Sequence, residues 1–250
     1  MKRLFWVILI GLLLLAIVPG CSQGEAKIRI ATDATWPPFE YVDEETMEIV
    51  GFDIDLFNAI AEKADLNIEF LNVAWDPLLA GIAQCQYDAA ISSITITPER
   101  AEAMLFSDPY FEAGQLVTVR IDNTDITCSA DLAGKTAGAQ IGTTGSFEIE
   151  KIDGATLKTY DDIGLAFQDL MNGQIDAIVA DSPLTLGYVN SNPDKIKTVG
   201  GMLTSESYGI AVCKDNPELL AAINAGLAEV KAEGIIDELI DEWSSWWVTN

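Results

Sequence analysis

The stretch QYDAAISS at residues 86–93 is the starting point, because a close copy of it, QIDAIVAD, occurs 88 residues later at 174–181. Each copy follows a run of residues with helical spacing of apolar side chains, at 79–85 and 167–173, and leads into a short apolar strand. A helix that leads into a strand is part of a βαβ unit. The sequence therefore predicts two similar lobes that use the same unit.

Strand and helix patterns alternate around both copies. Ile54, Phe57, Ile60 and Ala61 are three or four residues apart, which places them on one face of a helix. This alternation predicts an α/β fold in which each lobe is a mostly parallel sheet flanked by helices. We predict strands at 27–31, 68–71, 89–91, 115–120, 136–139 and 177–180, and helices at 51–64, 78–84, 145–151, 163–172 and, as one or two amphipathic helices, within 217–247.

The pattern restarts after residue 114, which indicates that the chain passes there from one lobe to the other. We expect residues 27–111 to form the first part of lobe 1, 112–206 to form lobe 2, and 207–250 to return to lobe 1 with the C-terminal helices. Crossings near 110–114 and 204–208 are the expected hinge.

The N-terminus reads as a targeting segment. Two basic residues after Met1 precede fifteen uncharged residues, 4–18, which is typical of a secretory signal and short for a membrane span. The sequence VPGC at residues 18–21 resembles a lipoprotein cleavage site. We therefore expect residues 1–20 to be removed, Cys21 to carry lipid, and 21–26 to be a tether. An uncleaved anchor helix is the alternative, and both place the chain outside the cytoplasmic membrane.

The charge balance excludes several function classes. The 250 residues include 39 acidic and 14 basic side chains, for a net charge of −25, and no histidine. Nucleic acid is excluded as a partner because binding phosphates needs a basic surface. Histidine-based triads and histidine metal ligands are excluded as well. We expect no cofactor, no metal and no catalytic residue.

Three cysteines follow the targeting segment: Cys85, Cys128 and Cys213. An oxidising compartment permits one disulfide, and the odd number leaves at least one thiol unpaired within the chain. Buried unpaired cysteines are one interpretation. If a pair forms, we predict Cys128–Cys213.

Polar residues follow the two repeated strands. Ligands of open α/β sheets bind beyond the carboxyl ends of the strands, so Ser92, Ser93 and Asp181 are expected at a cleft between the lobes. Arg100 is suited to bidentate hydrogen bonding to a carboxylate, or it is a surface arginine. Asp181 is suited to an ammonium group, or it caps the helix that Pro183 helps to start.

A second group of candidates follows other strands. Asp33 is a candidate for a cationic or amide group, or for a turn cap. Trp36 and Trp75 are candidates for stacking on a ligand, or for core packing. The sequence GTTGS at residues 142–146 allows close approach of the backbone and offers free N–H groups to an anion. It is not a nucleotide-binding P-loop, because no Gly-Lys-Ser/Thr follows.

Four motifs in order resemble the extracellular solute-binding proteins of polar amino-acid ABC importers, which have the type II periplasmic-binding fold. They are TD at 32–33 with PFE at 38–40, GFDIDL at 51–56, SSITITPER at 92–100 and QIGTT at 140–144. The resemblance covers nearly the whole chain after the targeting segment. It implies a monomeric, lipid-tethered receptor that binds a polar L-amino acid and delivers it to a membrane permease with its ATPase.

The resemblance also implies a role for each candidate. Arg100 would bind the ligand α-carboxylate with backbone N–H groups of Thr95 and Thr144, and Asp181 would bind the α-ammonium with help from Ser93. It also implies that Asp33 contacts the ligand side chain, that Trp36 and Trp75 form the walls of the side-chain pocket, and that Ser92 lies beside this pocket. Gln140 stands where glutamine-specific members carry a lysine.

One carboxylate, two indole faces and no lysine favour a cationic ligand side chain, so arginine or lysine is our prediction. Glutamine or another polar amino acid is the alternative ligand. Two other functions stay open: a dehydratase on the same fold that uses Asp33 or Asp181 as acid or base, and a free-standing sensor module.

Overall fold

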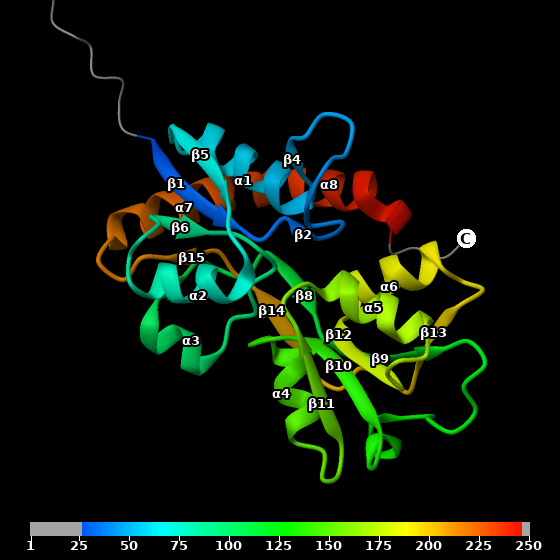
Figure 1. Ribbon diagram of the computed structural model, residues 1–250. Coiled ribbons are helices and arrows are strands. Elements are labelled where there is room, and N and C mark those ends of the chain that lie inside the picture. The colour runs from blue at the N-terminus through cyan, green and yellow to red at the C-terminus, as the bar shows by residue number, and fades with distance from the viewer. Residues whose placement is uncertain (1–26, 247–250) are drawn as a thin grey trace, which may run out of the picture.

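The computed structural model describes residues 27–246, which form two lobes around two five-stranded sheets (Figure 1). The predicted signal peptide, the Cys21 lipid site, the 21–26 tether and residues 247–250 lie outside the described residues. The first sheet has the order β5 (Ile68–Asn72), β1 (Ile28–Thr32), β6 (Ala89–Ala90), β15 (Ala211–Val212) and β7 (Leu105–Phe106). The second has the order β11 (Thr156–Tyr160), β10 (Thr136–Gln140), β12 (Ala177–Asp181), β9 (Gln115–Arg120) and β13 (Ile196–Val199).

The two sheets share one topology, which confirms the prediction of two similar α/β lobes. In the first, β5, β1 and β6 are parallel and β15 runs against its neighbours. In the second, β11, β10 and β12 are parallel and β9 runs against its neighbours. Each reversed strand is the first one that the chain enters after it crosses between the lobes.

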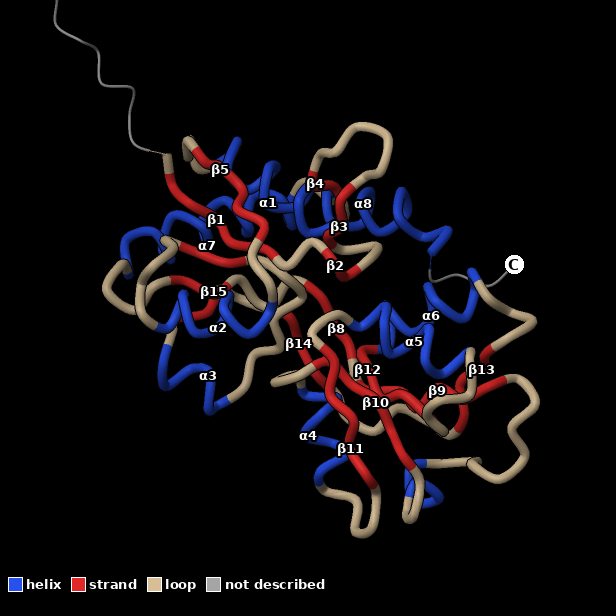
Figure 2. Tube along the Cα trace, in the orientation of Figure 1, coloured by secondary structure: helices blue, strands red, loops and turns tan. Residues whose placement is uncertain are grey.

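The crossings pair with each other. β8 (Phe111–Ala113) and β14 (Glu206–Tyr208) form a two-stranded antiparallel ribbon between the sheets (Figure 2). Both strands fall within the segments predicted to cross. Because this two-stranded ribbon joins the two lobes, it is the natural place for bending.

Helices cover the faces of both sheets. Lobe 1 has α1 (Phe52–Lys63), α2 (Trp75–Ala83), α3 (Pro98–Ala103), α7 (Pro217–Ala232) and α8 (Ile235–Trp243), and lobe 2 has α4 (Thr144–Glu150), α5 (Ile163–Met171) and α6 (Ser182–Ser191). Short 3-10 turns lie at η1 (Ser129–Leu132) and η2 (Ser244–Trp246). The predicted apolar face of α1 is buried, and α1 packs against α7 and α8.

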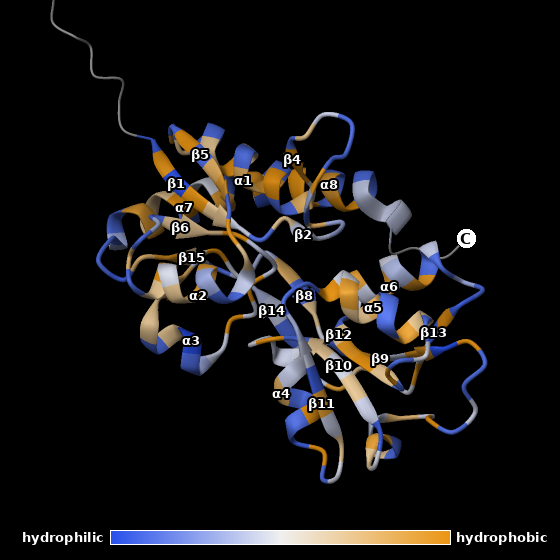
Figure 3. Cartoon of the chain, in the orientation of Figure 1, coloured by the Kyte–Doolittle hydropathy of each residue, from blue (hydrophilic) through white to orange (hydrophobic). Residues whose placement is uncertain are grey.

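Apolar residues are concentrated where helices meet sheets. Figure 3 shows them on α1, α5 and β12. Among the described residues, 27–246, the buried apolar side chains form three clusters. Within this same range, no helix has both the length and the apolar character that crossing a membrane requires.

A small sheet missed by the strand predictions brings residues to the cleft. It consists of β2 (Thr35–Trp36), β3 (Glu40–Val42) and β4 (Ile49–Val50). Gly51, which follows it, has φ of 137°, and a Cβ there would lie 2.2 Å from the carbonyl oxygen of Phe39. Glycine at the start of GFDIDL thus allows α1 to begin directly against the strand that carries Glu40.

The disulfide prediction was wrong: Cys85 pairs with Cys213, with their Cα atoms 4.9 Å apart, and Cys128 is an exposed thiol. Cys85 directly follows α2, and Cys213 follows β15, the neighbour of β6 in lobe 1. Cys128 lies in lobe 2, beside η1. Sequence spacing does not reveal the Cys85–Cys213 pair, because β15 joins lobe 1 only after the chain has passed through the whole of lobe 2.

Replacing both Cys85 and Cys213 by serine should destabilise the protein strongly. The bond closes a loop with a sequence separation of 128 residues that contains both crossings and all of lobe 2. We expect the free energy of unfolding to fall by about 2–5 kcal/mol and the melting temperature to fall by roughly 5–15 °C. Calorimetric melting measures this. Cys128→Ser is the control and should melt like the unmodified chain; an unchanged melting temperature in the double variant would contradict the expectation.

Candidate functional site

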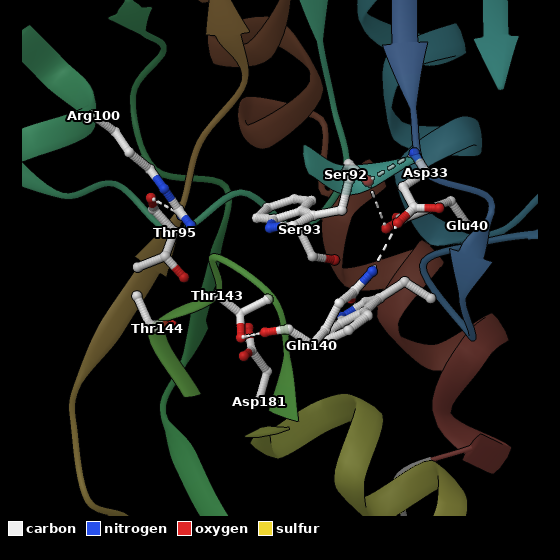
Figure 4. Close-up of a pocket in the computed structure, with 12 residues that line it drawn as sticks. Asp33, Glu40, Ser92, Ser93, Thr95, Arg100, Gln140, Thr143, Thr144 and Asp181 are labelled. Carbon is white, nitrogen blue, oxygen red and sulfur yellow. Dashed lines mark hydrogen bonds between the residues drawn. The ribbon is translucent and has the colours of Figure 1, made fainter. Parts of the chain in front are cut away.

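A pocket between the lobes brings together all ten residues predicted for the site (Figure 4). From lobe 1 come Asp33, Trp36, Trp75, Ser92, Ser93, Thr95 and Arg100, and from lobe 2 come Gln140, Thr144 and Asp181. Glu40 and Thr143, which the sequence interpretation did not single out, also line it. The carboxyl ends of β1, β10 and β12 supply three of these side chains, as expected for ligand sites of open α/β sheets.

The lobes are closed around this pocket. Gln140 Nε2 donates to Asp33 Oδ2 across the cleft at 3.0 Å, and Arg100 Nη2 donates to the Gly142 carbonyl at 3.2 Å. The cavity left between the side chains is about 10 Å³. That is the room for one water, far less than a free amino acid needs. A ligand of that size enters only if the lobes separate or these side chains turn.

Arg100 supplies the positive charge of the pocket. It lies on α3, its Nη1 donates to the Thr95 carbonyl at 2.8 Å, and its guanidinium carbon is 5.3 Å from the centre of the Trp75 ring. Burial lowers the pKa of Arg100 from its usual value, while the charges of Asp181 and Glu206 act in the opposite direction. Arg100 is therefore not an isolated surface arginine: it is a half-buried cation that lines the pocket over an aromatic ring, suited to a carboxylate.

Asp181 supplies a carboxylate at the base of the pocket. Its oxygens accept hydrogen bonds from Gln115 Nε2 and the Tyr208 hydroxyl, both at 2.6 Å. Burial, with the charge of Glu206 added, raises the pKa of Asp181 to about 6. Asp181 stands at the N-cap position of α6, but its side chain makes no capping hydrogen bond. The capping interpretation thus fails, and the carboxylate lines the pocket instead.

Asp33 lies across the pocket from Arg100 in Figure 4. It is 3% exposed and accepts hydrogen bonds from the Thr35 hydroxyl at 3.0 Å and from Gln140. Burial is the main cause that raises the pKa of Asp33. Among the described residues, the indole nitrogens of Trp36 and Trp75 and Oε1 of Gln140 have no hydrogen-bond partner. This end of the pocket combines a carboxylate, an unused amide acceptor and two indoles.

Comparison with known proteins agrees with this geometry. The family described as bacterial extracellular solute-binding proteins, family 3, matches residues 28–245. The chain belongs to this family. It is 36% identical over 250 residues to ABC transporter arginine-binding protein 1 of Escherichia coli, covering 97% of this chain and 99% of that one.

Solved structures show the same fold at higher identity. An ancestral arginine-binding protein bound to arginine is 41% identical, with a TM-score of 0.83 over 87% of this chain and 97% of that one. The arginine-, lysine-, histidine-binding protein of Geobacillus stearothermophilus is 38% identical, with a TM-score of 0.82 over 87% and 95%. The predicted resemblance and the type II periplasmic-binding fold are confirmed.

Two buried acids of this solute-binding protein escaped the sequence interpretation. Glu40 Oε1 accepts from the Ser92 hydroxyl at 3.0 Å, and Asp53 Oδ2 accepts from the Ser93 N–H at 2.7 Å and the Tyr110 hydroxyl at 2.8 Å. Burial raises the pKa of Glu40 well above its usual value and that of Asp53 to about 7. The charge of Asp53 adds to the shift at Glu40, and through their hydrogen bonds the two acids hold Ser92 and Ser93 in place.

A signal for these acids exists in the sequence. Glu40 ends the motif PFE and Asp53 is the third residue of GFDIDL, and both motifs carried the resemblance. The acid at Asp53 precedes an apolar helix face and reads as a favourable first-turn charge. Only the fold shows that it lies fully buried beneath the pocket.

Proposed function

We propose that this solute-binding protein is a receptor for a cationic L-amino acid, arginine first, which it encloses between its lobes and delivers to an ABC importer. One observation carries the proposal: the pocket places a half-buried guanidinium, Arg100, across from a buried carboxylate, Asp33, with a second buried carboxylate, Asp181, at its base. These three charges complement the carboxylate, the cationic side chain and the ammonium of arginine, in that order.

The charge at the side-chain end favours a cation over a neutral amide. Asp33 and the unused acceptor of Gln140 face a ligand that donates hydrogen bonds, and the two indoles offer faces to a flat cation. A desolvated contact between a cation and an aromatic ring adds about 2 kcal/mol. The arginine-binding relatives support this choice, and glutamine remains the alternative ligand.

The binding step we propose is a hinge closure on the β8–β14 ribbon. A ligand that contacts Arg100 in lobe 1 and Asp181 in lobe 2 gains both sets of contacts only when the lobes are closed. In the closed form, the Gln140–Asp33 bond completes the wall around the ligand side chain. The lobe boundaries that we propose for this motion are residues 27–111 with 207–250, and 112–206.

Attachment to the membrane is a separate part of the proposal. We propose that residues 1–20 are removed, that Cys21 is lipidated, and that 21–26 tether a monomeric receptor to the membrane. Mass spectrometry of the mature N-terminus tests this. For Asp33 and Asp181 we propose binding roles rather than catalytic ones, and the screen below tests this by including prephenate.

A thermal-shift screen tests the proposed ligand. The chain from Ser22 onward, unfolded and refolded to remove any carried ligand, is melted with each of the twenty amino acids, ornithine, citrulline and prephenate. A ligand at about a thousand times its Kd adds about 4 kcal/mol of stability. If arginine gives the largest shift, the proposal is supported. If glutamine gives the largest shift, glutamine and not arginine is the ligand. If only prephenate gives a shift, the enzyme interpretation is favoured over amino-acid binding.

Arginine affinity should fall in acid. The ammonium of the ligand binds the ionised form of Asp181, whose pKa in the ligand-free protein is about 6. Affinity is then flat above this value and falls by about tenfold per pH unit below it, until the pKa of the bound form is reached. Burial raises the pKa of Asp33 too, so protonation of Asp33 in acid should weaken arginine binding further. Calorimetric titrations at pH 8 and roughly one unit below the Asp181 pKa measure this.

The matched variant for this pH effect is Asp181→Asn. It should bind arginine more weakly at high pH and show a smaller loss of affinity on acidification. Equal pH dependence in the variant and the unmodified chain would show that another group titrates.

A further inference from the structure

We propose that Glu206, in the hinge strand β14, is a latch that holds the two lobes closed around the ligand carboxylate. It positions two pocket residues from opposite lobes and touches no part of the expected ligand itself. The inference rests on the proposed function for its effect on affinity, and on the structure alone for its effect on the shape of the ligand-free protein.

The evidence begins with the hydrogen bonds of this carboxylate. Glu206 Oε2 accepts from the Thr95 hydroxyl in lobe 1 and from the Thr144 hydroxyl in lobe 2, each at 2.8 Å. Its Oε1 accepts from Thr204 at 2.6 Å, and Gln115 Nε2 approaches Oε2 at 3.4 Å. Three hydroxyl donors around one carboxylate hold it in one position, since hydrogen bonds to an ionised acceptor are stronger than neutral ones.

The geometry couples this carboxylate to the closed state. Because both hydroxyls donate to the same oxygen, they lie no more than twice 2.8 Å apart. Thr95 is fixed to lobe 1 and Thr144 begins α4 of lobe 2. Any opening that moves the lobes apart at this point breaks at least one of the two bonds. The latch therefore stabilises the closed form relative to the open one.

The same contacts fix the positions of Thr95 and Thr144 at the end of the pocket beside Arg100. Thr95 and Thr144 are the residues whose backbone N–H groups we expect at the ligand carboxylate, and their hydroxyls are turned away toward Glu206. They line both the pocket and a groove of about 620 Å³ on its outer side, where Glu206 lies. The latch thus forms the wall between the ligand and that groove.

The hinge ribbon provides a matched control. Glu112 lies on β8, opposite Ser207, and its carboxylate accepts from the Ser207 hydroxyl at 3.1 Å. It is exposed and has the same charge as Glu206 on the same ribbon, and its hydrogen bonds join the two hinge strands rather than the two lobes. Glu112→Ala therefore removes a hinge carboxylate without removing the latch.

Small-angle X-ray scattering of the ligand-free chain from Ser22 onward tests the latch. Glu206→Ala should have a larger radius of gyration than the unmodified chain, while Glu112→Ala should not. When each is saturated with arginine, all three should reach the same radius. Glu206→Gln, which keeps one carbonyl acceptor for the hydroxyls, should lie between Glu206→Ala and the unmodified chain; it carries the test if the alanine variant fails to fold.

Binding kinetics give the second readout. Losing the hydrogen bonds to an ionised group should weaken arginine binding by about tenfold to a hundredfold, mainly through faster dissociation. An unchanged radius and an unchanged or higher affinity in Glu206→Ala would overturn the latch. If the unmodified chain does not bind arginine at all, the proposed function fails, and the scattering comparison still decides whether Glu206 holds the lobes together.

Discussion

Arg100→Ala should strongly weaken the binding of arginine. The side chain lines the pocket, donates to the carbonyl groups of Thr95 and Gly142, and is the positive charge that we expect at the ligand carboxylate. Truncating one partner of a buried, hydrogen-bonded charge pair costs about 2–5 kcal/mol, which is roughly a thirtyfold to several-thousandfold loss. Every amino acid carries the α-carboxylate, so the loss should be similar for all ligands tested.

Arg120→Ala is the control for this variant. Arg120 is an exposed arginine of lobe 2 that forms an ion pair with Asp122, and its loss should leave affinity unchanged. Calorimetric titration of both variants with arginine measures the difference. Normal binding by Arg100→Ala would show that the carboxylate end of the pocket has been assigned to the wrong residue.

Asp33→Asn should change which ligand binds rather than whether a ligand binds. The substitution replaces a buried carboxylate that the fold places at the side-chain end of the pocket, across from Arg100. A cationic side chain loses its counter-charge there, so we expect arginine affinity to fall by about a hundredfold. A neutral ligand such as glutamine loses no ion pair and should change by less than about tenfold.

The informative quantity is the ratio of the two affinities in one variant. A general disturbance of the pocket would weaken arginine and glutamine together and leave that ratio unchanged, against our assignment of Asp33. Asp43→Asn serves as a second control, because Asp43 lies in the exposed turn before β4 and its hydrogen bonds stay within that turn. It should bind both ligands like the unmodified chain.

The sequence predicted the fold where local pattern and spatial position agree. The repeated QYDA and QIDA segments lie at β6 and β12, which hold equivalent places in the two sheets. All ten predicted site residues line one pocket, because strand ends and the motifs that follow them lead to the same cleft. The predictions that were wrong or missing concern contacts between residues that are distant along the chain, or burial that only the fold reveals.

Three features show that limit. Strand β15 is two residues long and reaches lobe 1 only after the whole of lobe 2, so neither its reversed direction nor the Cys85–Cys213 bond is visible in local spacing. Glu206 is one acidic residue among 39 in the sequence, and its three hydroxyl donors include Thr95, which is 111 residues away along the chain. Asp53 reads as a helix first-turn acid, although it is fully buried.

A crystal structure of the refolded chain grown with arginine tests the central claim most directly. The account predicts one arginine between closed lobes, its carboxylate within hydrogen-bond distance of Arg100, its ammonium on Asp181, and its guanidinium on Asp33 beside Trp36 and Trp75. Arginine bound in the reverse direction, or absent from the pocket at saturating concentration, would contradict the account.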